Sequence, residues 1–119
     1  MSAKLLIVED SELNRDLLVQ IFEETYEIEL AADGRTALEM ATADRPDLIL
    51  MDIGLPGMSG LDVVRAIRAR AHDVPIIAVS SRVMPGDREL ALEAGCDEFV
   101  AKPIDDVVLI EMVDRLVRR

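Results

Sequence analysis

Four short apolar segments of this chain each end in a polar side chain that could do chemistry. These side chains are the acids Glu9, Asp10 and Asp52, the alcohol Ser80 and the amine Lys102. Apolar runs of this length are typical of buried strands, so each of these side chains is expected at a strand end. The carboxyl ends of parallel strands meet at one edge of a sheet, where ligands bind. Carboxylates gathered there can hold a hard divalent cation, and one can act as a nucleophile toward a phosphoryl group.

The elements that must position these residues follow a regular alternation. Short apolar segments alternate with longer segments of helical period, which predicts β-α-β units around a parallel sheet. The predicted strands cover residues 4–8, 27–31, 48–52, 75–80 and 99–101. The predicted helices cover residues 12–25, 60–71, 85–94 and 105–118, with one more that follows a turn at Asp33-Gly34 and runs to residue 43.

Composition limits the class of protein. The chain has 119 residues, half of them apolar, which is enough for one domain with its own core, so residues 1–119 are expected to form a single domain. A net charge of −11, with 24 acids and 13 scattered bases, predicts that it does not bind nucleic acid directly. A lone cysteine, Cys96, suits a reducing compartment, and no apolar stretch approaches the roughly 20 residues of a membrane helix. We therefore expect a cytoplasmic protein without membrane contact.

The last predicted helix has more apolar surface than a sheet can cover. Its apolar residues span an arc of about 200°, whereas a helix on a sheet needs a stripe somewhat wider than about 100°. One flank is therefore expected to be exposed, with Met112 and Val117 as candidate positions. Such a flank is either ordinary surface scatter or a surface for a partner or a second copy.

The order and context of Glu9-Asp10, Asp52, Ser80 and Lys102-Pro103 resemble the receiver domain of two-component response regulators, and the similarity covers the whole chain. The resemblance implies a flavodoxin-like α/β fold, a doubly wound sheet of five parallel strands in the order 2-1-3-4-5 flanked by five helices. It implies that Asp52 accepts a phosphoryl group from a histidine kinase or a histidine phosphotransfer protein. It also implies a signalling domain and not an enzyme, although transfer and dephosphorylation would be self-catalysed.

The same resemblance implies a Mg²⁺ site, which Mn²⁺ could also occupy. Asp10, Asp52 and the backbone carbonyl of Gly54 would be ligands, and Glu9 would act through water. Lys102, in a cis bond to Pro103, would contact a phosphoryl oxygen and could pair with Asp52 before phosphorylation.

A switch is implied as well, in which Ser80 moves toward the phosphoryl group and Phe99 fills the space it leaves. The signal would pass through the face of the fourth helix, fifth strand and fifth helix to a protein partner or a second copy. Arg82 would border the site beside Gly54, and His72, the only histidine, is expected on the solvated surface.

Several alternatives use similar chemistry. A Mg²⁺-dependent phosphohydrolase of the haloacid-dehalogenase type needs a D-x-D element after the first strand, whereas Asp52-Ile53-Gly54 follows the third. A flavin carrier needs a phosphate-cradling loop where this chain has acids, and a degenerate receiver would lack some acceptor-site residues. The sequence leaves open whether the chain is a stand-alone receiver, of the chemotaxis type, or one domain of a larger regulator or hybrid kinase.

Overall fold

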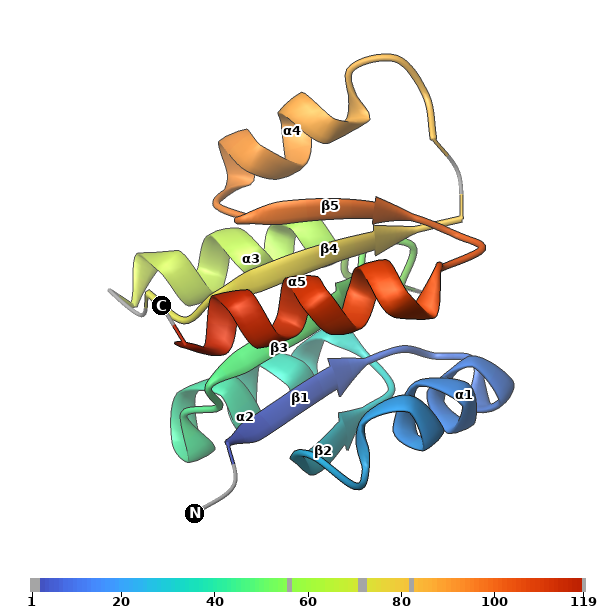
Figure 1. Cartoon of the computed structure of the whole chain (residues 1–119). Coiled ribbons are helices and arrows are strands. Elements are labelled where there is room, and N and C mark those ends of the chain that lie inside the picture. Colours follow the sequence, from blue (N-terminus) through green and yellow to red (C-terminus); the bar gives the residue numbers. More distant parts are fainter. Residues whose placement is uncertain (1–2, 56, 71–72, 82, 119) are drawn as a thin grey trace.

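The computed structural model describes residues 3–55, 57–70, 73–81 and 83–118, in which strands and helices alternate (Figure 1). The strands are β1 (Lys4–Val8), β2 (Glu27–Ala31), β3 (Leu48–Asp52), β4 (Ile76–Ser80) and β5 (Glu98–Ala101). The helices are α1 (Glu12–Phe22), α2 (Gly34–Asp44), α3 (Gly60–Ala69), α4 (Asp87–Ala94) and α5 (Asp106–Arg118). His72 and Arg82 lie outside the described residues.

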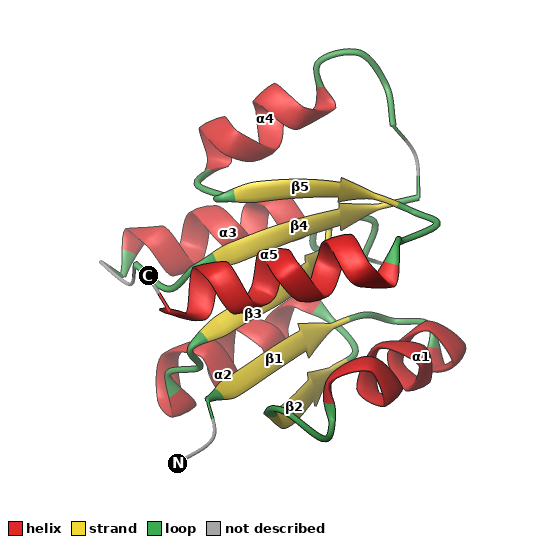
Figure 2. Ribbon diagram, viewed as in Figure 1, coloured by secondary structure: helices red, strands yellow, loops and turns green. Residues whose placement is uncertain are grey.

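The strands form one parallel sheet in the order β2-β1-β3-β4-β5, which confirms the predicted topology. Helices cover both faces of the sheet (Figure 2). Successive side chains of a strand point to opposite faces of the sheet, so the strands contribute side chains to two separate apolar clusters. One cluster packs against α2, α3 and α4, and the other packs against α1 and α5. Among the described residues, no helix combines the length and hydropathy that crossing a membrane requires.

Helix ends differ from the prediction by up to three residues. Helix α1 ends at Phe22 and not at Thr25, because the chain turns there and both Thr25 and Tyr26 donate their N–H groups to the Phe22 carbonyl. The predicted turn at Asp33-Gly34 is instead the start of α2. Asp33 is the N-cap, and hydrogen bonds from Thr36 hold the pKa of its carboxyl below the usual value.

Helix α5 confirms the expected exposed apolar flank but not the expected positions. Val107, Val108 and Ile110 are exposed, whereas Met112 and Val117 are partly buried and pack against the cluster shared with α1. The reason is helical spacing. Met112 and Val117 lie three and four residues from the buried residues of the helix, so they border its inward stripe.

An arginine of α3 joins three segments at the opposite edge from the acids. Arg68 donates hydrogen bonds to the carbonyl oxygens of Val74, at 2.7 Å, and Gly95, at 2.8 and 3.0 Å. It also contacts the Asp97 carboxylate at 3.2 Å, and that carboxylate accepts from the backbone N–H of Ile76. Hydrogen bonds from one guanidinium group therefore connect α3 to the segments that lead into β4 and β5. Next to Asp97, burial raises the pKa of the Cys96 thiol to about 11, which keeps it protonated.

Tyr26, the only tyrosine in a chain without tryptophan, donates its hydroxyl to Asp114 of α5. Burial and then the Asp114 carboxylate raise the Tyr26 pKa to about 12. We expect tyrosinate absorbance of the folded protein to titrate near that value, and near 10 in denaturant. Because the folded pKa is the higher one, Tyr26 adds stability below about pH 10 that is lost as the pH rises through about 12.

The Asp114→Asn variant is the control for this titration. Its midpoint should fall, though not to 10, because the burial of the ring persists. A midpoint near 10 in the folded unmodified protein would contradict the contact with Asp114.

Candidate functional site

The acids, Ser80 and Lys102 lie at the carboxyl edge of the sheet, and Gly54 follows in the loop after β3, whereas Phe99 lies within β5. Glu9 and Asp10 follow β1, Asp52 and Ser80 are the last residues of β3 and β4, and Lys102 follows β5. Strand pairing continues for one residue beyond these ends. The N–H of Glu9 donates to the Ala31 carbonyl and that of Lys102 to the Ser80 carbonyl. The backbone of the site is therefore fixed by the same ladder that builds the sheet.

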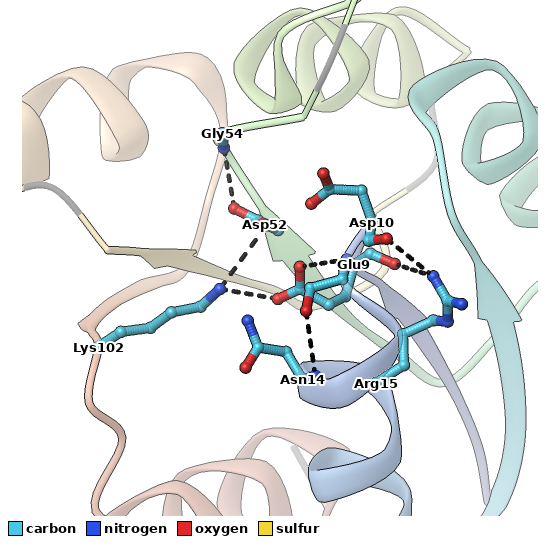
Figure 3. Close-up of polar contacts among 8 residues, drawn as sticks. Glu9, Asp10, Asn14, Arg15, Asp52, Gly54 and Lys102 are labelled. Atoms are coloured by element: carbon cyan, nitrogen blue, oxygen red, sulfur yellow. Dashed lines mark hydrogen bonds and ion pairs between the residues drawn. The ribbon is translucent and has the colours of Figure 1, made fainter.

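The three acids form a compact cluster (Figure 3). Glu9, Asp10 and Asp52 each place a carboxylate oxygen within 4.8 Å of the other two. Glu9 and Asp52 are buried, whereas Asp10 is exposed at the mouth of the cluster. Like charges at this separation repel, and a hard divalent cation neutralises them with the oxygen ligands that it prefers. The donor set thus fits a Mg²⁺ or Mn²⁺ ion, in agreement with the sequence.

Asp52 is oriented by one backbone donor. Its Oδ1 accepts from the N–H of Gly54 at 2.9 Å, and its Oδ2 lies 3.7 Å from the Lys102 ammonium. A Cβ atom at Gly54 would stand 3.5 Å from Oδ1, an ordinary van der Waals contact, so a side chain could be built there beside this oxygen.

Lys102 has a closer partner than the expected one. Its Nζ lies 2.7 Å from Glu9 Oε1, one ångström nearer than Asp52 Oδ2. The implied cis bond between Lys102 and Pro103 is present. The Lys102 ammonium therefore forms its closer ion pair with Glu9 and its longer one with Asp52.

Ser80 and Phe99 lie on the adjacent strands β4 and β5. Ser80 is buried at the strand end, and Phe99 is partly buried and packs against the apolar cluster that contacts α3 and α4.

A groove of about 530 Å³ also reaches the site, between α1 and the start of α5. Leu17, Ile21, Pro103 and Ile104 line it, together with Lys102 at its polar end.

Sequence reasoning missed two supporting residues. Arg15 donates to the backbone carbonyls of Glu9 and Asp10 and so braces the acid loop. Gly60 begins α3 directly against the end of β3, where an added Cβ atom would come within 2.5 Å of the Asp52 carbonyl oxygen. A glycine at a predicted helix start was the only sequence signal for the latter.

A doubly wound sheet with an acid cluster, a serine and a lysine at one edge offers groups that can hold a divalent cation and contact a phosphoryl group. Residues 5–114 match the family described as the response regulator receiver domain, and the chain belongs to this family. It is therefore a receiver domain of two-component signalling, which is a signalling domain and not a classical enzyme. The phosphohydrolase and flavin-carrier alternatives are set aside.

Two curated relatives of the chain are longer proteins. Response regulator PleD of Caulobacter vibrioides is 42% identical over 121 residues, which cover 99% of this chain and 27% of that protein. Response regulator MprA of Mycobacterium ulcerans is 36% identical, covering 100% of this chain and 52% of that protein. The chain thus spans about a quarter to a half of the length of these curated relatives.

Solved structures agree with the fold. The receiver domain of the sensor histidine kinase PA1611 of Pseudomonas aeruginosa, with a magnesium ion coordinated in its active-site cleft, has a TM-score of 0.91 and 34% identity, with 100% of both chains covered. Chemotaxis protein CheY4 of Vibrio cholerae has a TM-score of 0.90 and 30% identity over 98% of this chain and 99% of that one.

Proposed function

We propose that Asp52 accepts a phosphoryl group from a phosphohistidine on a histidine kinase or phosphotransfer protein. The observation that carries this proposal is the placement of the Asp52 carboxylate, between the acid pair and the Lys102 ammonium, with Oδ1 held by Gly54. A carboxylate oxygen forms the new bond to phosphorus while the bond from phosphorus to the imidazole nitrogen breaks. The electron pair stays on that nitrogen while the other ring nitrogen carries the proton, so the products are a neutral histidine and an aspartyl phosphate.

A divalent cation belongs to this proposal. When bound, it supplies positive charge against the equatorial phosphoryl oxygens, which is most of what phosphoryl transfer requires. Asp10, Asp52 and the Gly54 carbonyl would hold it, with Asp10 facing solvent where the ion enters. Lys102 would contact a phosphoryl oxygen as a point charge, and the same groups would support attack by water when the phosphoryl group is released.

Exposed apolar residues of α1 beside Asp52 are proposed as the docking surface for the protein donor. Leu13 and Leu17 of α1 are 69% and 50% exposed, and Leu17 lines the groove that ends at Lys102. An apolar helix of the donor could cover these residues while its phosphohistidine reaches Asp52. We therefore propose that residues 1–119 act as one cytoplasmic receiver unit that meets its donor through α1 and its output partner through another face.

Labelling with a small phosphodonor tests the proposed function. Incubation with acetyl phosphate and Mg²⁺ should add one phosphoryl group by intact mass, and peptide mapping should place it on Asp52. Chelation of Mg²⁺ should suppress the addition, because the acids then lack their cation. No mass increase with Mg²⁺ present, or a label on another residue, would overturn the proposal.

The signal is proposed to leave through Ser80 and Phe99. The Ser80 hydroxyl would move to the new phosphoryl group, and Phe99 would turn into the space beside it. These movements would shift the equilibrium between two conformations of the surface formed by α4, β5 and α5. That face carries the exposed apolar residues Leu90 and Val108, which suit a protein partner or a second copy.

The Ser80→Ala variant separates uptake from output. It should still be phosphorylated, within about tenfold of the unmodified rate, because Asp52 and the acids remain. Amide shifts on phosphorylation, measured by NMR across residues 80–112, should largely disappear in this variant. Full-sized shifts in α4 and β5 of the Ser80→Ala protein would rule out the hydroxyl as the link.

A further inference from the structure

We infer that Arg15 is a positioning residue for the divalent cation, because it holds the backbone of Asp10 in place. The inference rests on the proposed site, in which Asp10 is one of the two carboxylate ligands. Arg15 itself would not touch the cation. It would act through the acid loop, residues 9–11, which joins β1 to α1.

Asp10 is the least constrained of the three acids. Glu9 and Asp52 are buried, and Asp52 is the last residue of a strand that is paired on both sides. Asp10 is exposed and belongs to neither β1 nor α1. Within the described part of the chain, its one hydrogen bond is the bond that its carbonyl oxygen accepts from Arg15 Nη1 at 3.2 Å. Between the end of β1 and the start of α1, the Asp10 backbone is therefore held by Arg15.

One nitrogen of the guanidinium group holds two successive carbonyls. Nη1 also donates to the Glu9 carbonyl oxygen at 2.9 Å, in a partly buried contact. Figure 3 shows Arg15 reaching both carbonyls from the side of the acid loop away from Lys102. The two soft backbone dihedrals of Asp10 lie between these carbonyls. Holding both at one point restricts those dihedrals, and they set the direction of the Asp10 side chain.

The place of Arg15 on α1 explains why it can reach the acid loop. Its backbone N–H donates to the Ser11 carbonyl at 2.9 Å, so the first turn of the helix fixes its Cα atom. Long side chains of a helix point back toward its N-terminus, which is where the acid loop lies. The helix dipole favours negative charge at that end, so it does not favour an arginine there. The two bonds to backbone carbonyls are the contacts that do.

Arg15 has two effects on a bound cation, and they have opposite signs. Its positive charge repels a divalent ion, so charge alone predicts that a neutral residue at position 15 strengthens binding. Loss of the two hydrogen bonds frees the Asp10 backbone, which a bound ion must then order, and this weakens binding. Groups that orient a metal ligand typically contribute about 10- to 100-fold in affinity. The sign of the change therefore decides between positioning and charge.

Magnesium affinity of the unphosphorylated protein, followed by NMR titration of the Gly54 amide, measures this sign. Arg15→Met keeps an unbranched side chain of good helix propensity but removes the charge and the donors. We expect it to bind Mg²⁺ about tenfold more weakly than the unmodified protein. Arg15→Lys keeps the charge and should also bind more weakly, because its shorter side chain does not reach both carbonyls. Unchanged or tighter binding by Arg15→Met would overturn the inference.

The Asp10→Asn background separates positioning from a general loss of structure. Asp10→Asn alone should weaken Mg²⁺ binding by more than about tenfold. Adding Arg15→Met should weaken it no further, because the ligand that Arg15 positions is gone. Equal weakening by Arg15→Met in both backgrounds would make its role a structural one and overturn the inference. If Asp10→Asn binds Mg²⁺ as tightly as the unmodified protein, the proposed metal site fails and the inference fails with it, a result distinct from a failure of Arg15→Met alone.

Phosphoryl uptake from acetyl phosphate provides a second measurement. In Arg15→Met the Mg²⁺ concentration for half-maximal uptake should rise about tenfold, while the rate at saturating Mg²⁺ should stay within about threefold of the unmodified rate. More metal overcomes a weakened metal site but does not restore a displaced nucleophile. Arg65→Met, which removes an exposed arginine of α3, is the matched control and should change neither value. An unchanged half-maximal concentration in Arg15→Met, with a low rate at saturating Mg²⁺, would contradict the inference.

Discussion

Asp52→Asn is expected to reduce phosphoryl uptake from acetyl phosphate by more than about 10³-fold, the scale of losing a reaction's nucleophile. The amide has nearly the same shape as the carboxylate, and its oxygen can still accept the hydrogen bond from Gly54. It lacks the negative oxygen that must bond to phosphorus. Intact mass after incubation with acetyl phosphate and Mg²⁺ measures the effect.

The matched control is Asp16→Asn, which removes one negative charge from the exposed surface of α1 and should be labelled normally. The Asp52→Asn protein should also be at least as stable as the unmodified one without metal, because one of three mutually repelling carboxylates is neutral. Undiminished labelling of Asp52→Asn would remove the central claim.

Arg68→Ala is expected to lower the free energy of unfolding by about 2–4 kcal/mol, because its loss removes a donor shared by several partly buried acceptors. The carbonyls of Val74 and Gly95 would lose their donor, and Asp97 would lose the cation beside it. Urea unfolding followed by circular dichroism measures the change, which corresponds to a fall of roughly 10 °C in Tm.

Arg65→Ala serves as the control on the same helix. Its ion pair with Asp62 is more than half exposed, so the loss should stay within about 0.5 kcal/mol. Arg68→Lys should recover little of the lost free energy of unfolding, because one ammonium cannot reach all the acceptors that the guanidinium group spans. Equal stability of Arg68→Ala and Arg65→Ala would contradict the structural role given to Arg68.

The strands were predictable because their signal is local. Apolar runs bounded by polar residues gave β1, β2 and β3 to the residue, and the parallel arrangement then placed Asp52, Ser80 and Lys102 at one edge. Helix ends were less predictable, because the turn after Phe22 depends on how the chain enters β2.

The finer contacts of the site could not be predicted. Whether Lys102 reaches Glu9 or Asp52 depends on the lengths of side chains from strands that are not neighbours in the sheet. The closeness of Gly60 to the Asp52 backbone depends on how α3 packs, and two acceptors of Arg68, Gly95 and Asp97, lie more than 25 residues away in the sequence. Such contacts leave no periodic pattern in a sequence.

The sheet order has a consequence for local stability. Asp52 ends the central strand β3, which is buried throughout and bonded on both sides, whereas Phe99 belongs to β5, an edge strand of four residues that is only partly buried. Backbone opening is easiest where a strand has one neighbour and few buried contacts. Amide hydrogens of β5 are therefore expected to exchange faster than those of β3. The residue proposed to receive the phosphoryl group is thus held by a strand that is bonded on both sides, whereas Phe99, which is proposed to respond, lies on an edge strand whose backbone opens more easily.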